Sequence, residues 1–234
     1  MSNYLTYLQK ISNSKTFKRK YDYFRYNYGK LLFFEKNNIE SVLEIGPGLG
    51  EFISYLNSRK IKNIDIVDND EKILAYNKSK FKINRTFQAN RLADIEKELS
   101  NYDAIVLTQM LEHIPKEQYK EFLTILFDHL KENGIMIITV PNMANPFTLC
   151  ERYADLTHYN GFTDVSLREL VNYCNLKKAK TFVKNFDIPP YSVVNIIRGI
   201  IQNILHKLIL LLSIANGGTY SKFLTPNITL IIKK

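Results

Sequence analysis

Short apolar runs alternate with longer, more polar segments from residue 39 to residue 140. A run of four to eight apolar residues that ends at a glycine, proline or polar turn is typical of a buried strand. Such runs predict strands at Ile39–Ile45, Ile64–Val67, Ile83–Phe87, Tyr102–Leu107 and Ile135–Val140. The intervening segments predict helices at Glu51–Lys60, Asp70–Ser79, Leu92–Leu99 and Lys116–Lys131. This alternation favours a doubly wound, mostly parallel α/β sheet with its ligand crevice beyond the carboxyl ends of the strands.

The two ends of the chain extend this core. The later part predicts one more helix, with Ser166 as its N-cap, and two further strands: Ser166–Cys174, Lys180–Phe186 and Asn227–Ile232. No internal repeat or low-complexity linker separates the parts. We therefore expect a single domain over residues 1–234. Its expected parts are an N-terminal helical cap at 1–38 and a core at 39–234 with a helical insertion around 190–218.

A glycine-rich loop follows the first predicted strand, in the order Leu43-Glu44-Ile45-Gly46-Pro47-Gly48-Leu49-Gly50-Glu51. Glycines permit a tight turn with positive φ and a close approach of the backbone to a ligand. The second strand ends at Asp68, whose carboxylate can accept hydrogen bonds from both hydroxyls of a ribose. A structural turn followed by an acidic helix cap would explain the same residues. The combination of strand, loop, helix, second strand and terminal Asp favours a nucleoside cofactor.

Several segments together resemble the class I S-adenosylmethionine-dependent methyltransferases. The segment Glu44–Gly50 with Asp68 is similar to their first motif and ribose-binding acid. The stretch Leu111-Glu112-His113 after the fourth strand, and Asn133-Gly134 with Pro141-Asn142 around the fifth, are also similar. The resemblance implies a Rossmann-like sheet of seven strands and S-adenosylmethionine as cofactor, with S-adenosylhomocysteine as product.

The same resemblance implies cofactor contacts for seven residues. Gly46 and Gly48 would lie under the cofactor, Glu44 near its amino group and Asp68 at its ribose. Asn90 stands where the family commonly has Asp, and an amide can still accept a hydrogen bond from the adenine amino group. The remaining two, expected beside the sulfonium, are Gln109 and Met110.

His158 is the leading candidate for work on the methyl acceptor. The segment from Asp155 to Leu167 resembles one in methyltransferases of bacterial surface-polysaccharide (capsule or O-antigen) biosynthesis, and related segments in quinone-precursor O-methyltransferases. On that basis His158 is a general base or an acceptor-orienting residue, and Asp155 can fix its tautomer. Alternatively, His158 only ties its loop to the sheet. His113 can contribute to catalysis or cap the turn before Pro115. We expect no metal, because no ligand cluster shows metal-binding spacing.

Charge and hydropathy limit the partners. The net charge of +9 is divided into +5 over residues 1–40, −4 over 41–175 and +8 over 176–234. Basic ends can attract anions or an anionic membrane face. Solvated lysines without a specific partner would give the same charge pattern. Residues 193–215 predict an amphipathic helix, because their apolar residues recur with a helical period. The apolar face of this helix can pack on the sheet or on a second subunit, line an acceptor pocket, or lie on a membrane surface. Charged residues within this segment argue against a spanning helix.

These observations predict an enzyme that methylates an oxygen of a small acceptor. The expected acceptor is an anionic or phosphorylated sugar, nucleotide sugar or other precursor of surface polysaccharide. A lipid or quinone precursor at the membrane and a non-catalytic cofactor-binding module are the alternatives. Nucleic acid is not expected, because Thr108-Gln109-Met110-Leu111 stands where an Asn-Pro-Pro-Tyr type motif would follow the fourth strand. Two cysteines without a disulfide framework, and no apolar leader, predict a cytoplasmic location, with the inner membrane surface as an option.

Overall fold

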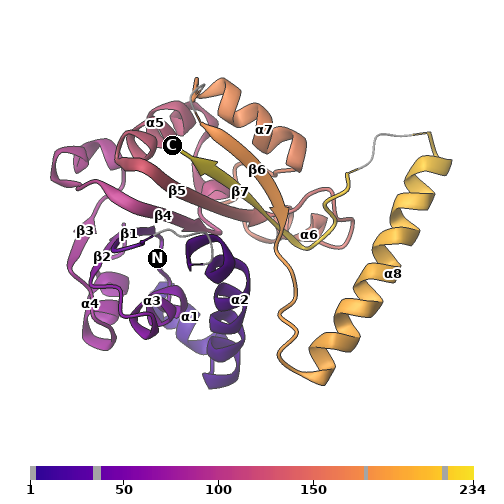
Figure 1. The fold of residues 1–234 in the computed structure, drawn as a ribbon, viewed down its shortest axis with the longest axis horizontal. Helices are drawn as coiled ribbons and strands as arrows, with labels where there is room; N and C mark the ends of the chain where they lie inside the picture. Colours follow the sequence, from indigo (N-terminus) through magenta and orange to yellow (C-terminus); the bar gives the residue numbers. More distant parts are fainter. Residues whose placement is uncertain (1–3, 34–37, 177–178, 218–220) are drawn as a thin grey trace.

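A computed structural model describes the chain except for residues 1–3, 34–37, 177–178 and 218–220 (Figure 1). The described strands are β1 Ser41–Ile45, β2 Asn63–Asp68, β3 Arg85–Gln88, β4 Tyr102–Thr108, β5 Leu130–Pro141, β6 Lys180–Asn185 and β7 Asn227–Lys233. They form a seven-stranded sheet in the order β3-β2-β1-β4-β5-β7-β6. The pairs from β3 to β5 are parallel, and β7 is antiparallel to both of its neighbours. The mostly parallel, Rossmann-like sheet is therefore confirmed.

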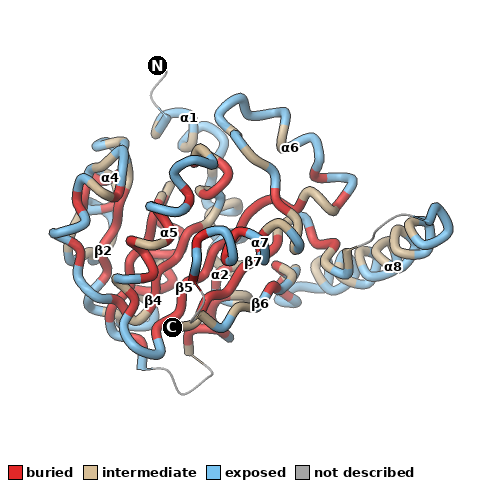
Figure 2. Tube along the Cα trace, turned by 90° about the horizontal axis from the view of Figure 1, so that it is seen from above, coloured by how far each residue is buried: buried red, intermediate tan, exposed pale blue. Residues whose placement is uncertain are grey.

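Helices cover both faces of the sheet (Figures 1 and 2). Their bounds are α1 Tyr4–Ile11, α2 Ser14–Phe33, α3 Glu51–Ser58, α4 Glu71–Lys80, α5 Tyr119–Asp128, α6 Leu149–Ala154, α7 Asp164–Tyr173 and α8 Val193–Ala215. Successive strand residues point to opposite faces, so Val42 belongs to the core beneath α2 and α3, whereas Leu43 belongs to the core beneath α5 and α7. The predicted N-terminal helical segment is present as α1 and α2.

Three details of the predicted helices were wrong. The segment from Leu92 to Leu99 forms two 3-10 turns, because Ile95 leaves helical geometry while both leucines stay buried in one core. The helix α5 ends at Asp128 instead of Lys131, since Leu130 already pairs with Tyr102 in the sheet. The N-cap of α7 is Thr163, not Ser166.

A capping box explains the shifted start of α7. The side chain of Thr163 accepts a hydrogen bond from the backbone of Ser166, and the Ser166 hydroxyl bonds back to the Thr163 backbone N–H. This reciprocal pair satisfies two helix-end N–H groups. Ser166 therefore has a capping function, but from the third helical position.

The long helix α8 stands apart from the sheet in both views (Figures 1 and 2). None of its residues is buried, so of the alternatives that the sequence left open, packing of α8 on the sheet is not observed. Its half-buried positions include the polar residues Asn195, Gln202, His206 and Ser213, whereas its opposite face is exposed and apolar. That exposed stripe consists of Ile197, Ile200, Ile204, Leu208 and Leu211. By length and composition, α8 is also long and apolar enough to cross a membrane.

Candidate active site

The glycine loop between β1 and α3 is an open backbone cradle. Gly46 and Gly48 have φ values of 71° and 53°, a left-handed geometry that favours glycine. A methyl group added at Gly48 would meet no atom within 4 Å, so the space beside the loop is free. The helix α3 begins after Gly50 without a side-chain cap, so its first backbone N–H groups have no side-chain acceptor and can bind a ligand. The loop can therefore receive a polar, carboxylate-bearing ligand.

Glu44 supplies a negative charge beneath this cradle. Its side chain is only 4% exposed, and its Oε2 atom accepts no hydrogen bond from the described residues. Burial raises the pKa of this carboxyl well above its ordinary range, and the charges of Glu51 and Asp68 raise it further. A buried carboxylate without a partner is unfavourable. An ammonium group of a ligand would remove that penalty, as expected for the amino group of S-adenosylmethionine.

Asp68 and Asn90 lie together at the carboxyl edge of the sheet. Asp68 pairs in register with Gln88, and Asn90 follows two residues later as an exposed residue. The Asp68 carboxylate accepts a hydrogen bond from the Asp70 backbone N–H at 2.9 Å. Partial burial raises its pKa to about 6. The remaining acceptor capacity of Asp68 fits ribose hydroxyls.

Met110 faces the glycine loop, but Gln109 turns away to another strand. A methyl group added at Gly46 would lie 3.4 Å from the Met110 sulfur, so Met110 forms a wall of the cradle. Gln109 has a φ of 54°, and its Nε2 donates to Asn227 Oδ1 of β7 at 2.8 Å. Sequence reasoning had not identified Asn227, since no local pattern connects a residue of the last strand with the fourth.

Two histidines from distant segments of the chain lie side by side. His113 follows β4, and His158 lies in the loop between α6 and α7. Their ring centroids are 4.6 Å apart with planes inclined at 63°. The two segments are fastened together by the Tyr159 backbone N–H, which donates to the Glu112 carbonyl at 2.9 Å. The structure thus brings together the two histidines that the sequence singled out.

Hydrogen bonds fix which nitrogen carries the proton when each imidazole holds only one. His158 Nδ1 lies 2.9 Å from the Glu151 carbonyl oxygen, which can only accept, so this nitrogen is the donor. Asp155 was predicted to fix the tautomer of His158, but the backbone carbonyl of Glu151 does so in the structure. Asp155 Oδ2 lies 4.0 Å from the other nitrogen, His158 Nε2. The lone pair of His158 is left on Nε2.

Asp155 acts on His113 instead. The Thr157 hydroxyl donates to Asp155 Oδ1 at 2.6 Å, which leaves the hydroxyl oxygen free to accept from His113 Nδ1 at 2.9 Å. This chain places the His113 proton on Nδ1 and its lone pair on Nε2. Burial lowers the pKa of His113, and the neighbouring His158 lowers it further. Both imidazoles therefore offer an Nε2 lone pair.

Glu112 completes the cluster as a buried carboxyl. Its side chain is 1% exposed, and neither carboxylate oxygen accepts a hydrogen bond from another described residue. Burial raises its pKa to about 8, with added contributions from Glu151 and Asp155. One potential ligand atom comes from each of Glu112, His113 and His158. These three atoms all lie within 4.8 Å of one another, a geometry that could hold a metal ion. Sequence spacing gave no sign of it, because His158 is far from the other two along the chain.

Tyr4 of α1 connects the two halves of the site. Burial raises the pKa of its hydroxyl, and the carboxylates of Asp68 and Asp155 raise it further. Tyr4 is therefore close enough to sense both the cofactor acid and the acceptor loop. Half of its side chain remains exposed. The first helix thus lies at the edge of the candidate site.

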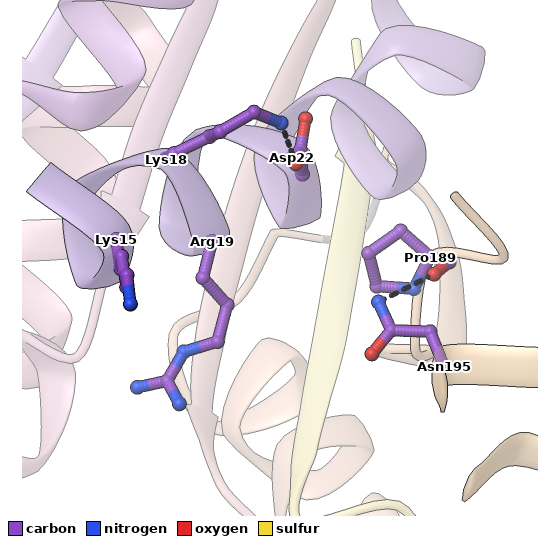
Figure 3. Close-up of a pocket in the computed structure, with 6 residues that line it drawn as sticks. All are labelled: Lys15, Lys18, Arg19, Asp22, Pro189 and Asn195. Atoms are coloured by element: carbon purple, nitrogen blue, oxygen red, sulfur yellow. Dashed lines mark hydrogen bonds and ion pairs between the residues drawn. The ribbon is translucent and has the colours of Figure 1, made fainter. Parts of the chain in front are cut away.

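A separate hollow of about 200 Å³ lies between α2 and the start of α8 (Figure 3). Its lining includes the three basic side chains Lys15, Lys18 and Arg19, together with Asp22, Pro189 and Asn195. Lys18 is paired with Asp22 at 2.8 Å, whereas Lys15 and Arg19 extend freely in this view. None of the cofactor or acceptor residues lines this hollow. It is a basic surface feature outside the candidate active site.

Comparisons with known proteins agree with this site. A family model described as a methyltransferase domain matches residues 17–180. A solved SAM-dependent methyltransferase from Archaeoglobus fulgidus is 20% identical, with a TM-score of 0.67 and coverage of 100% of both chains. The plantazolicin methyltransferase BpumL, solved with a monoazolic desmethylPZN analogue and SAH, is 15% identical, with a TM-score of 0.60. That match covers 94% of this chain and 85% of BpumL. No curated protein matched the chain.

The family match spans well over half of the chain, and the structural matches have the same fold. The open glycine cradle, the unpartnered Glu44 and the carboxylate of Asp68 fit S-adenosylmethionine, whose demethylated product is bound in BpumL. The chain therefore belongs to the methyltransferase-domain family and is a class I S-adenosylmethionine-dependent methyltransferase.

Proposed function

We propose that the enzyme methylates a hydroxyl oxygen of a small, anionic or phosphorylated acceptor. The carrying observation is the pair of imidazoles, His113 and His158, whose ring centroids lie 4.6 Å apart and whose Nδ1 hydrogen bonds leave a lone pair on each Nε2. An alcohol is a weak nucleophile, so a group that orients it and takes its proton accelerates the transfer. We assign this role to His158, which lies in a loop on a rigid scaffold and keeps 11% of its side chain exposed.

The chemistry of the transfer explains why these groups suffice. S-adenosylmethionine supplies an activated methyl carbon: the acceptor oxygen bonds to it, the carbon–sulfur pair stays on sulfur, and the hydroxyl proton leaves. The protein aligns the reactants and excludes water. Thr157 and the Glu151 carbonyl hold the two rings in place, and Asp155 acts through Thr157. Asp155 is therefore a positioning residue in this proposal.

Sugars, nucleotide-linked sugars and phosphoryl-bearing precursors of surface polysaccharide are the proposed acceptor class. The support is the resemblance between residues 155–167 and the corresponding segment of such methyltransferases, together with the basic ends of the chain. Basic side chains favour an anionic acceptor through long-range attraction. A small-molecule acceptor also agrees with the desmethylPZN analogue bound by BpumL.

A screen with methyl-labelled cofactor tests this proposal. Purified protein is incubated with phosphorylated sugars, nucleotide-linked sugars and neutral sugars, and label transfer is measured. We expect transfer to an anionic hydroxyl acceptor, and a loss of kcat of about 100-fold or more in His158→Ala. His129→Ala, which alters a histidine at the end of α5, is the matched control. Full kcat in His158→Ala with the true acceptor would rule out the assigned role.

A lipid or quinone precursor at a membrane surface is the second candidate, and α8 favours it. A soluble helix normally turns its apolar stripe inward. In α8 the polar residues Asn195, Gln202 and His206 are partly covered, and the stripe from Ile197 to Leu211 is exposed. We propose that this stripe lies on the anionic cytoplasmic face of a membrane. The basic C-terminal part of the chain, +8 over residues 176–234, would favour such an anionic surface.

Vesicle sedimentation separates the two candidates. We expect binding to vesicles with anionic lipid that weakens with salt, and much less binding to neutral vesicles. Ile204→Asp should reduce binding about tenfold or more, because it places a charge in the apolar stripe. Gln202→Asp adds the same charge on the covered face and should bind almost as wild type. A concentration-dependent dimer that Ile204→Asp dissociates, without vesicle binding, would assign α8 to a second subunit.

A further inference from the structure

Glu112, His113 and His158 form a three-residue cluster whose ligand atoms all lie within 4.8 Å of one another. Imidazole nitrogen and carboxylate oxygen are the usual protein ligands of divalent transition metals. An ion at about 2.1 Å from each ligand requires ligand atoms roughly 3 to 4 Å apart. Small side-chain rotations therefore suffice to close the three groups around one ion.

The hydrogen bonds around the cluster match those that support metal-binding histidines. Such a histidine donates its other ring N–H to a backbone carbonyl or, directly or through a neighbour, to a carboxylate. His158 Nδ1 donates to the Glu151 carbonyl, and His113 Nδ1 donates to Thr157, which in turn donates to Asp155. Both rings consequently carry a lone pair on Nε2, and no proton has to move between ring nitrogens before an ion binds.

Glu112 provides an independent sign of a missing partner. Its side chain is 99% buried, and neither carboxyl oxygen accepts a hydrogen bond from another described residue. Burying polar oxygens without a partner is costly. A divalent cation that replaces the carboxyl proton would give Glu112 a partner and would also bind the two nitrogen lone pairs.

We propose that Glu112, His113 and His158 bind a divalent transition-metal ion, such as Mn²⁺ or Zn²⁺. Three protein ligands leave open coordination positions, which is the arrangement of catalytic and not of structural sites. The use of the ion rests on the proposed function: the acceptor hydroxyl coordinates at an open position and releases its proton to solvent water more readily. The coordinated oxygen then takes the methyl carbon, and sulfur keeps the electron pair of the broken bond.

A bound ion changes the chemical role of His158, but His158 still lies next to the acceptor. A nitrogen that coordinates a cation cannot also accept the acceptor proton, so the ion-bound enzyme uses His158 to orient the acceptor through the metal. General-base action by His158 belongs to the alternative without an ion. Both roles require His158 near the acceptor, so loss of activity in a His158 variant does not distinguish them. A direct measurement of ion binding does.

Titration of the chelator-treated protein with Mn²⁺, followed by the electron paramagnetic resonance signal of the free ion, tests the site. We expect saturable binding of one ion per chain, displaced by Zn²⁺. Glu112→Gln and His158→Asn should each weaken binding by more than about tenfold, and Thr157→Val by about tenfold through loss of the supporting hydrogen bond. His129→Asn is the matched control and should bind as wild type.

Titration with S-adenosylhomocysteine on the same samples verifies that each variant is folded. Wild-type protein that binds S-adenosylhomocysteine but neither Mn²⁺ nor Zn²⁺ would overturn the ion site. Equal ion affinity in Glu112→Gln and wild type would do the same. Ion binding as expected, with no methyl transfer to any hydroxyl acceptor, would instead support the ion site and refute the proposed function.

Discussion

The Tyr28 hydroxyl of α2 donates to Thr139 Oγ1 of β5 at 2.6 Å, inside the core of the protein. The same hydroxyl lies 2.8 Å from Thr108 Oγ1, the last residue of β4. This contact fastens the N-terminal cap to the end of the strand that leads into Met110 and Glu112. Because the group is fully buried, water cannot replace the lost hydrogen bonds.

We therefore expect Tyr28→Phe to lower the free energy of unfolding by about 1 to 2 kcal/mol, measured by urea denaturation. Tyr26→Phe is the control, since Tyr26 lies on the same helix and its ring, not its hydroxyl, makes the recorded contacts. Equal stability of Tyr28→Phe and wild type would show that the buried hydroxyl contributes nothing.

Asp68 should make the cofactor-free protein less stable at high pH. Its pKa is raised by burial from an ordinary 3.8 to about 6, so the folded protein binds this proton more tightly than the unfolded chain does. The carboxylate therefore costs stability above about pH 6, and the cost disappears as the pH falls toward 4. We expect Asp68→Asn to stabilise the protein by roughly 1 to 3 kcal/mol at pH 8, and hardly at all at pH 4.

Urea unfolding at the two pH values measures this difference, with the exposed Asp94→Asn as the control for removal of one negative charge. Loss of stability in Asp68→Asn at pH 8 would contradict the assignment. A gain in stability together with weaker S-adenosylhomocysteine binding would show that Asp68 is retained for its ligand.

Gly48 and Gly217 form a matched pair that separates backbone strain from ligand contact. Both have positive φ, and a methyl group added at either would meet no atom within 4 Å. Each Gly→Ala change should therefore cost about 1 kcal/mol of stability. Only Gly48→Ala should also abolish S-adenosylhomocysteine binding in calorimetry, because only Gly48 belongs to the cradle. Equal ligand affinity in the two variants would remove Gly48 from the binding site.

Local sequence patterns predicted the parts of the molecule that local interactions determine. The run that ends in Gly46 and Gly48 became a strand, a left-handed turn and a helix N-terminus. Asp68 was placed correctly at the end of β2, because an apolar run followed by a carboxylate marks that boundary. The short segment from Leu92 to Leu99 was misassigned, since burial of its leucines outweighed its helical propensity.

Contacts between distant segments could not be predicted from the sequence. Glu112 and His158 meet only because the loop after α6 folds back on the residues that follow β4. The Gln109 side chain bonds to Asn227 of the last strand for the same reason. The stripe of α8 showed helical periodicity, but periodicity alone does not indicate whether the apolar face points inward or outward.

Calorimetric titration with S-adenosylhomocysteine tests the cofactor site. We expect micromolar binding of one ligand per chain by wild type, and loss of this binding in Asp68→Ala. The exposed Glu71→Ala, which removes a carboxylate from the first turn of α4, should bind as wild type. Folded wild-type protein that binds no S-adenosylhomocysteine, or Asp68→Ala that binds it with unchanged affinity, would contradict the cofactor site described for this chain.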